Sequence, residues 1–140
     1  MRVAAVDLGK VRVGLAVSDD LGVLAHPRPA LGGGHPKKLL GELVRLARTE
    51  RIDRFLVGLP LNRNGEEGSQ ALRARKFAQA LADATECEVE LVDERLSTVE
   101  ATRRLSEVGV SAKQRRPLID SASAAVLLQA WLEGRQEASG

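Results

Sequence analysis

The amino-acid sequence predicts an α/β protein with a mixed five-stranded sheet and about four helices on its faces. Three strand-like apolar segments come first in the chain, and helical and strand-like segments alternate after them. Leading antiparallel strands followed by such alternation imply a sheet that is antiparallel on one side and parallel on the other. A length of 140 residues suits one domain, so we expect residues 1–140 to form a single domain.

The first two expected strands lie in the stretch VAAVDLGKVRVGLAVSD, residues 3–19. Its two apolar runs, at residues 3–6 and 13–17, are joined by a tight connection that contains Gly9. Glycine at this position and at Gly14 leaves room for a ligand to approach the main chain. The next segment, VLAHPRPAL, contains two prolines and predicts a third strand at or near an edge of the sheet.

Helical and strand-like segments alternate from Pro36 onward. Apolar residues at helical spacing predict a helix over residues 36–51, with the proline at its start. The segments RFLVGLP and CEVELVDE are typical of buried strands, and the polar loop LNRNGEEG follows the first of them. A second helix is predicted between these strands. Its apolar stripe comprises Ala71, Leu72, Phe77, Ala78, Leu81 and Ala82.

The segment after the fifth expected strand has the pattern of a helix start. STVE, residues 97–100, matches a capping box and predicts a helix that runs to about Val108 and is closed by Gly109. Residues 110–118 show no periodicity and contain several cations, so we expect a mobile basic loop there. The last helix is expected over residues 120–134, and the small residues of its start, DSASAAV, allow close packing.

Composition argues against several classes of protein. Apolar residues make up 44% of the chain, and no apolar run approaches the roughly 18 residues of a membrane span. The start of the chain lacks the features of a signal peptide, and Cys87 is the single cysteine, so we expect a cytoplasmic protein without an intrachain disulfide. His26 and His35, both expected in solvated loops, add too few soft ligands for a structural zinc site.

The charge of the chain is mildly basic and unevenly distributed. The formal net charge is +2, and five cations against one acid lie within residues 103–116. The aromatic residues are Phe55, Phe77 and Trp131, so the base-stacking platform used by many single-strand binders is not available. A nucleic-acid partner would therefore be bound through phosphate contacts and shape.

Acidic residues occur at the ends of the expected elements. Asp7 ends the first strand, Asp93 or Glu94 ends the fifth, and Asp120 opens the last helix. If the first, fourth and fifth strands are parallel neighbours, their carboxyl ends share one sheet edge, to which the last helix could bring Asp120. Three such carboxylates would repel one another unless they held a hard divalent cation such as magnesium or manganese.

Each acid also has a purely structural interpretation. Asp7 could hydrogen-bond to its own turn, and Asp120 could cap the N-terminus of its helix. Glu94 could be an exposed acid paired with Arg95. The spacing of the residues leaves these alternatives open.

Four stretches of the sequence together carry a family resemblance. VDLGKVRVGLAVSD, VGLPLNRNGEEG, VDERLSTVEA and DSASAAVLLQAWL resemble motifs of the YqgF family, also called RuvX, in the same order and over almost the whole chain. The resemblance implies a ribonuclease H-like fold of the RuvC type and a metal-dependent nuclease. It further implies hydrolysis of structured nucleic acid, in pre-16S rRNA 5′-end processing or Holliday junction resolution, with Mg²⁺ or Mn²⁺ as cofactor.

The resemblance also implies roles for particular residues. The acids of its motifs fall on Asp7, Glu94 and Asp120, which are implied to be both catalytic residues and metal ligands, so Glu94 is preferred over Asp93. A four-way DNA junction has two-fold symmetry, and we expect a homodimer with two active sites for that substrate, whereas structured RNA needs only one. Phosphate contacts are expected from Lys10, Arg12, Asn62, Arg63, Arg95, Lys113, Arg115 and Arg116.

Two other functions fit part of the pattern. A non-catalytic nucleic-acid binding module could have the same fold, but intact acids at all three positions argue against it. The first motif also resembles the phosphate loop of actin-like ATPases. Those proteins build their nucleotide cleft between two lobes, and 140 residues supply only one.

Overall fold

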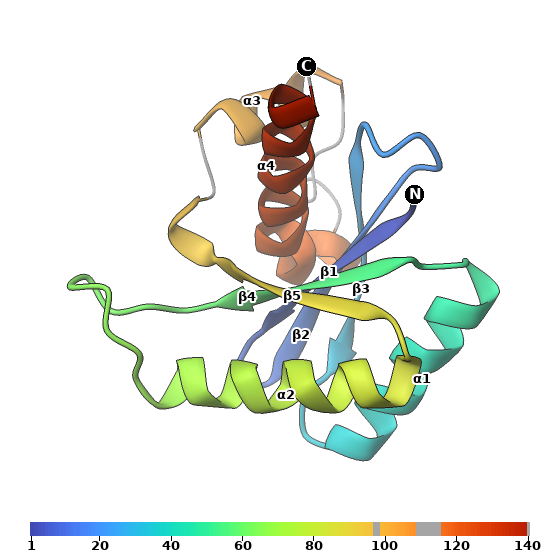
Figure 1. Ribbon diagram of the computed structural model, residues 1–140, viewed down its shortest axis with the longest axis vertical. Coiled ribbons are helices and arrows are strands. Elements are labelled where there is room, and N and C mark those ends of the chain that lie inside the picture. The colour runs from blue at the N-terminus through green and yellow to red at the C-terminus, as the bar shows by residue number, and fades with distance from the viewer. Residues whose placement is uncertain (97–98, 109–115, 140) are drawn as a thin grey trace.

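A five-stranded sheet forms the middle layer of the molecule (Figure 1). A computed structural model describes residues 1–96, 99–108 and 116–139. The strand order is β3-β2-β1-β4-β5, with β1 antiparallel to β2, β2 antiparallel to β3, and β1, β4 and β5 parallel. This confirms the mixed sheet expected from the sequence, with the proline-containing β3 at an edge. The strands are β1 (Val3–Leu8), β2 (Arg12–Ser18), β3 (Ala25–Gly32), β4 (Arg54–Leu59) and β5 (Glu88–Asp93).

Four α-helices and two 3₁₀ helices are present in the described part of the chain. None of these helices is both long enough and apolar enough to cross a membrane. The α-helices are α1 (Pro36–Thr49), α2 (Ser69–Thr85), α3 (Val99–Glu107) and α4 (Ala122–Ser139), and the 3₁₀ helices are η1 (Glu94–Leu96) and η3 (Arg116–Ser121).

Two expectations about the C-terminal part of the chain are wrong. Residues 116–118, expected in a mobile loop, belong to η3, and α4 begins and ends later than the expected 120–134. A short 3₁₀ helix leaves little periodicity in a sequence, so contacts with the sheet decide its position. The capping residue Ser97, the closing Gly109 and residues 110–115 lie outside the described residues.

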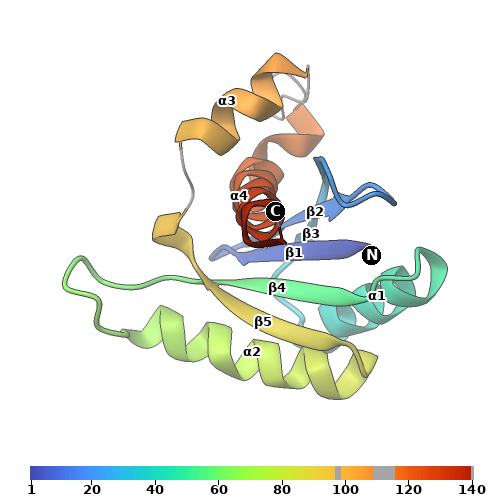
Figure 2. The ribbon, with the colours of Figure 1, turned by 45° about the horizontal axis from the view of Figure 1, so that its top comes forward.

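Alternating side chains of the strands contribute to two apolar cores, one on each face of the sheet. Ala4 and Val6 face the core that α1 and α2 cover, whereas Val3 and Ala5 face the core under α4. Figure 2 shows α2 and α4 on opposite sides of the sheet, and α3 packs on α4. Small residues such as the fully buried Ala124 let α4 approach the sheet closely, as its sequence predicts.

One residue of the predicted stripe on α2 is exposed instead of buried. Leu72 is 57% exposed. It lies one position after the buried Ala71, which places it about 100° around the helix and off the buried stripe. The buried residues of the helix recur every three or four positions: Ala71, Ala74, Ala78 and Leu81.

The carboxyl ends of β1, β4 and β5 meet at one edge of the sheet, because these strands are parallel. The 3₁₀ helix η1 follows β5 at this edge, and α4 contacts it. The other 3₁₀ helix, η3, contacts β2 and β3 and leads into α4. Elements far apart in the sequence therefore converge where the sequence predicts the acidic residues.

Candidate active site

Asp7 and Glu94 project from the same face of the sheet. Asp7 lies two residues after Ala5 in β1, and Glu94 lies two residues after Val92 of β5. Ala5 and Val92 both belong to the core under α4, and side chains two positions apart share a face. Because β4 lies between β1 and β5, the two carboxylates reach toward each other across β4.

Gly58 of β4 makes this approach possible. A Cβ atom at this position would lie 2.6 Å from Oε1 of Glu94 and 3.1 Å from its Cγ. The Glu94 side chain therefore lies directly against the main chain of β4. Sequence analysis did not single out Gly58, although an isolated glycine inside an apolar strand often marks a close approach by another group.

The surroundings of Glu94, including the neighbouring Asp7 carboxylate, raise its pKa. Burial, a hydrogen bond with Asp7, and the negative charges of Asp7 and Asp93 raise the pKa of Glu94 from 4.5 to about 7. A hydrogen bond that raises this pKa is one that protonated Glu94 donates to the Asp7 carboxylate. The pair is therefore a site where negative charge is crowded and a cation would be bound favourably.

Asp93 faces a different environment although it is adjacent in the sequence. Arg95 donates to it from Nη2 (2.9 Å to Oδ2), from Nε and from its main-chain N. These hydrogen bonds lower the pKa of Asp93. Arg95 therefore pairs with Asp93 in the described part of the chain, whereas Glu94 lies beside Asp7.

The main chain at Asp120 lies beside the strand that carries Asp7. Gly14 is the register partner of Asp7, and a Cβ atom on Gly14 would lie 2.5 Å from the Asp120 carbonyl oxygen. The fully buried Ser121 holds η3 in place, because its Oγ accepts a hydrogen bond from the Leu15 main-chain N (2.9 Å) and donates one to a carbonyl oxygen of β3. Gly14 and Ser121 thus determine where Asp120 lies.

The carboxylate of Asp120 is not part of the Asp7–Glu94 pair in this structure. It accepts a hydrogen bond from Nη1 of Arg12 at 2.8 Å, and its side chain is 40% exposed. Within residues 1–96, 99–108 and 116–139, no three acidic, histidine or cysteine side chains come together as a metal site. The structure brings two of the three predicted acids together and leaves the third alongside them, paired with an arginine.

A pocket of about 360 Å³ opens above the two acids. Thr102 of α3 and residues of the first turns of α4 line it together with the two acids. Thr102 and Ser123 were missed by sequence analysis: Thr102 lies just after the VDERLSTVEA motif, and Ser123 lies within DSASAAVLLQAWL, where only the aspartate was singled out. The pocket is lined by Asp7, Glu94, Thr102, Ala122, Ser123, Val126 and Leu127. It therefore combines two carboxylates and two hydroxyls with an apolar wall.

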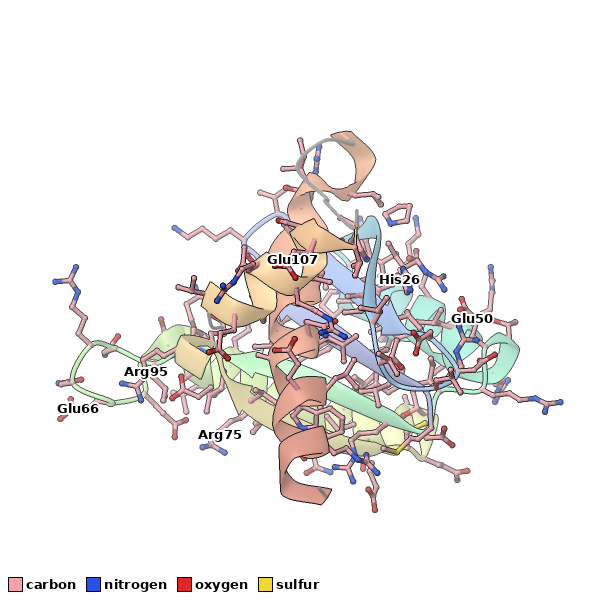
Figure 3. The ribbon with its side chains drawn as sticks, turned by 90° about the horizontal axis from the view of Figure 1, so that it is seen from above. His26, Glu50, Glu66, Arg75, Arg95 and Glu107 are labelled. Atoms are coloured by element: carbon pink, nitrogen blue, oxygen red, sulfur yellow. The ribbon has the colours of Figure 1, made fainter. Side chains whose placement is uncertain are left out.

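The loop between β4 and α2 projects beyond the same edge of the sheet as a small hairpin (Figure 1). Leu61 and Glu67 form an antiparallel bridge, and the main-chain N of Asn62 donates to the Glu66 carbonyl oxygen at 2.9 Å. Arg63 is exposed on this hairpin. Figure 3 shows Glu66 at the far end of the molecule, on the side that also carries Arg95.

The cations expected to contact phosphate differ in how far their charges are offset. Arg12 and Arg95 each pair with an aspartate, whereas Lys10 and Arg63 form no ion pair with any side chain that the structure describes. Arg116 begins η3. The other two expected residues, Lys113 and Arg115, lie outside the described part of the chain.

The strand order, with carboxylates at the ends of the first and last strands, defines a ribonuclease H-like fold of the RuvC type. RuvC of T. thermophilus, solved in complex with a Holliday junction, superposes with a TM-score of 0.64 at 14% identity, covering 98% of this chain and 96% of that one. The fowlpox virus resolvase, solved with Holliday junction DNA, gives a TM-score of 0.58 at 14% identity, covering 96% and 99%. At such identities the likeness concerns the fold alone.

Comparison of sequences narrows the class to one family. A family model described as "RuvX: Holliday junction resolvase" matches residues 1–134, and the chain belongs to the RuvX family. A relative from Anaeromyxobacter sp. (strain Fw109-5) is 45% identical over 135 residues, which cover 96% of this chain and 98% of the relative. One from Myxococcus xanthus (strain DK1622) is 43% identical over 136 residues, covering 97% and 90%. Both carry the name "Putative pre-16S rRNA nuclease".

Proposed function

We propose that this protein is a divalent-metal-dependent nuclease that hydrolyses phosphodiester bonds in structured nucleic acid. The observation that carries the proposal is the Asp7–Glu94 pair: two neighbouring carboxylates at the ends of strands that line one pocket, with the pKa of Glu94 raised by burial and by Asp7. Membership of the RuvX family supports it, and so do the names of the relatives. Acids that destabilise each other's charge are characteristic of functional sites.

The donor set fits a magnesium or manganese ion. Magnesium is usually bound through one or two carboxylates, with water and substrate phosphate completing its coordination. Asp7 and Glu94 would supply the two carboxylates, and a bound cation would remove the repulsion that raises the pKa of Glu94. When bound, such an ion lowers the pKa of a water nucleophile and stabilises the leaving oxygen.

The chain's own residues provide the positioning. The ends of β1 and β5 and the contact with Gly58 hold Asp7 and Glu94 in place. Thr102 and Ser123 offer hydroxyl groups to phosphate oxygens, and the apolar wall of α4 limits access of water from one side. We propose that Asp120 joins the pair when its carboxylate leaves Arg12, whose exposed side chain (68%) is free to swing toward phosphate.

We propose pre-16S rRNA as the main substrate, in the cytoplasm, because the relatives that cover nearly the whole chain carry that name. The family description and the fold neighbours make a four-way junction the second substrate to test. A homodimer is proposed only for junction cleavage, since two cuts related by two-fold symmetry need two active sites.

Cleavage of a labelled precursor rRNA fragment and of a labelled four-way junction, each with Mg²⁺, Mn²⁺ or a chelator, tests the proposal. We expect cleavage with either metal and none with the chelator. Binding without cleavage under all conditions would contradict the proposal and favour a non-catalytic binding module. In such a module Asp120 would stay paired with Arg12, as it is in this structure. Asp120→Asn separates the roles of that residue: an active variant would remove Asp120 from the site, because an amide is a poor metal ligand.

A further inference from the structure

Arg73 contacts the turn that follows Asp7 and has no acidic partner in the described part of the chain. Arg75, two residues further along α2, donates to the Glu67 carboxylate from both Nε and Nη2 (2.8 Å for Nη2 to Oε2). Arg12 and Arg95 are also paired with acids. Within the described part of the chain, no carboxylate lies within ion-pair distance of Arg73.

The guanidinium of Arg73 reaches the turn that follows Asp7. Its Nη1 donates to the Gly9 carbonyl oxygen at 2.9 Å in a partly buried contact. A guanidinium carries five N–H donors in a planar fork that matches the oxygens of a phosphate. Donors therefore remain for an anion after the contact with Gly9 is made.

The position of Arg73 places a positive charge close to the pocket but on its other side. Gly9 follows Asp7 by two residues, at most about 7 Å along an extended chain. Figure 2 shows α2 on the face of the sheet opposite to α4. Arg73 belongs to α2 and therefore reaches the turn at Gly9 from that face. Lys10 is exposed in the turn between β1 and β2, and it also forms no ion pair with a described side chain.

We propose that Arg73 binds a backbone phosphate of the nucleic acid beside the turn between β1 and β2. A strand that places one phosphate over Asp7 and Glu94 passes over this turn, and a phosphate one or two nucleotides away then meets the unpaired guanidinium. The inference rests on the proposed function, because it assumes that the pocket receives a phosphodiester. It adds a contact on the α2 side of the sheet that the sequence motifs do not indicate.

A purely structural role for Arg73 makes a different prediction. If the residue only holds the turn through Gly9, the charge is dispensable and the N–H donor is not. Arg73→Gln keeps a donor and removes the charge, whereas Arg73→Lys keeps the charge. Arg75→Gln is the matched control on the same helix, since the charge of Arg75 is already offset by Glu67.

The test measures binding to a labelled RNA hairpin and to a labelled four-way junction over a series of salt concentrations, without divalent metal. Each phosphate contact contributes about 0.9 to the slope of log affinity against log salt on duplex. We expect Arg73→Gln to weaken binding and to lower the slope by about 0.9. Arg73→Lys and Arg75→Gln should keep the wild-type slope.

Three results would overturn the inference: an unchanged slope in Arg73→Gln, an equal fall in Arg75→Gln, or an equal fall in Arg73→Lys. Melting temperatures of all variants identify a loss of binding that comes from unfolding. Failure of the inference is distinguishable from failure of the proposed function. If the wild type binds and cleaves while Arg73→Gln keeps the wild-type slope of log affinity against log salt, the phosphate contact of Arg73 is wrong and the nuclease activity stands. If the wild type binds but never cleaves, and Arg73→Gln lowers the slope, the nuclease activity is wrong and the phosphate contact stands.

Discussion

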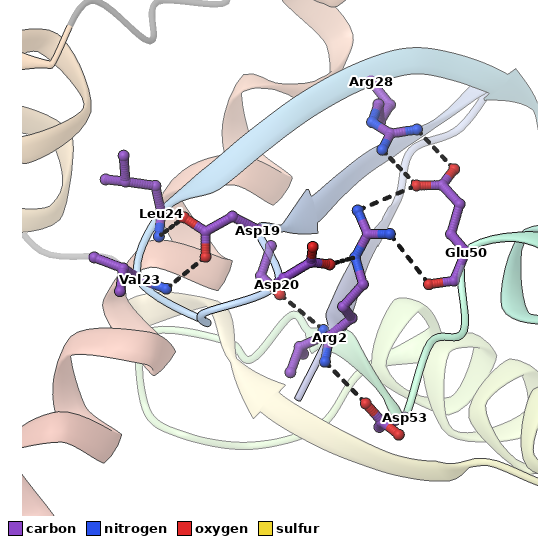
Figure 4. A network of polar contacts seen from close by, with 10 residues as sticks. Arg2, Asp19, Asp20, Val23, Leu24, Arg28, Glu50 and Asp53 are labelled. Carbon is purple, nitrogen blue, oxygen red and sulfur yellow. Dashed lines mark hydrogen bonds and ion pairs between the residues drawn. The ribbon is translucent and has the colours of Figure 1, made fainter.

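The two ends of the parallel strands carry the same kinds of charged side chain in opposite arrangements. Where β1 begins, the Glu50 carboxylate accepts hydrogen bonds from Nη1 and Nη2 of Arg28 at 2.9 and 2.6 Å and also pairs with Arg2 (Figure 4). Asp53 accepts a hydrogen bond from the main-chain N of Arg2 at 2.9 Å. The hydrogen bond from Arg28 lowers the pKa of Glu50, although burial acts in the opposite direction.

Where β1 ends, Asp7 and Glu94 face each other, and the pKa of Glu94 rises to about 7. The nearby arginines, Arg12 and Arg95, pair with Asp120 and Asp93 instead. The partners of an acid, and not its residue type, thus separate a carboxylate whose pKa is lowered by arginines from one whose pKa is raised by another acid. Stability of the fold alone would favour acids paired with arginines at both ends of the parallel strands.

The largest expected effect comes from neutralising the facing acids. Asp7→Asn or Glu94→Gln should lower cleavage by about 10²- to 10³-fold, the range for losing one transition-state-stabilising group. The free energy of unfolding without metal should stay the same or rise, because the change removes repulsion. Cleavage rates and urea unfolding of each variant measure the two effects. A variant that keeps its activity would remove that acid from the site.

A smaller effect is expected at Gly58, which allows the two acids to meet. Gly58→Ala places a Cβ atom 2.6 Å from Oε1 of Glu94, so the side chain must move. A shift of this kind should lower cleavage by roughly 10- to 100-fold. Gly134→Ala is the matched control, since nothing lies within 4 Å of its Cβ position, and it should raise the free energy of unfolding by about 0.5–1 kcal/mol. Full activity of Gly58→Ala would contradict the geometry described for Glu94.

Where β1 begins and Glu50 is paired with arginines, we expect a substitution to change the stability of the protein and not its activity. Glu50→Ala leaves the guanidinium groups of Arg28 and Arg2 without this carboxylate and should lower the free energy of unfolding by about 1–3 kcal/mol. Cleavage should not change. Glu66→Ala, a change at an exposed acid of the hairpin, should alter stability by less than about 0.5 kcal/mol. A loss of activity in a fully folded Glu50→Ala protein would show that the two ends are coupled.

The smallest effect is a difference in pH dependence. The pKa of Glu94 is higher in the folded protein than its ordinary 4.5, so its protonated form favours folding. That contribution is complete below about pH 4.5 and is lost as the pH rises through 7. Without metal, Glu94→Gln should therefore exceed the wild type in stability above pH 7, by on the order of 1 kcal/mol after solvent screening, and match it near pH 4.5.

Glu50 has the opposite sign. Its lowered pKa makes a contribution that is present above pH 4.5 and is lost as the pH falls through the folded value. Unfolding curves of Glu94→Gln and Glu50→Ala over this pH range measure both trends. If the two variants diverged from the wild type in the same direction with pH, the contrast between the two ends would be wrong.

Local patterns in the sequence determined the order and type of most elements and the positions of the acids at their ends. The apolar runs of β1, β2, β4 and β5 and the helical spacing of α1 and α2 are short-range signals, which side-chain periodicity records directly. Asp7 could be located at a strand end for the same reason. The short helix η3 could not, because it depends on Ser121 bonding to strands about 100 residues earlier in the chain.

Tertiary structure alone decided how the charges are partnered. Motif resemblance selected Glu94 over Asp93, but the register of β5 on β4 and the missing Cβ of Gly58 are what bring Glu94 to Asp7. Arg12 and Asp120 are 108 residues apart in the sequence and meet in the fold. Charge pairing acts over a few ångströms in space, so a sequence that shows each charged residue does not show which ones are offset, and Arg73 is therefore recognisable as unpaired only in the folded chain.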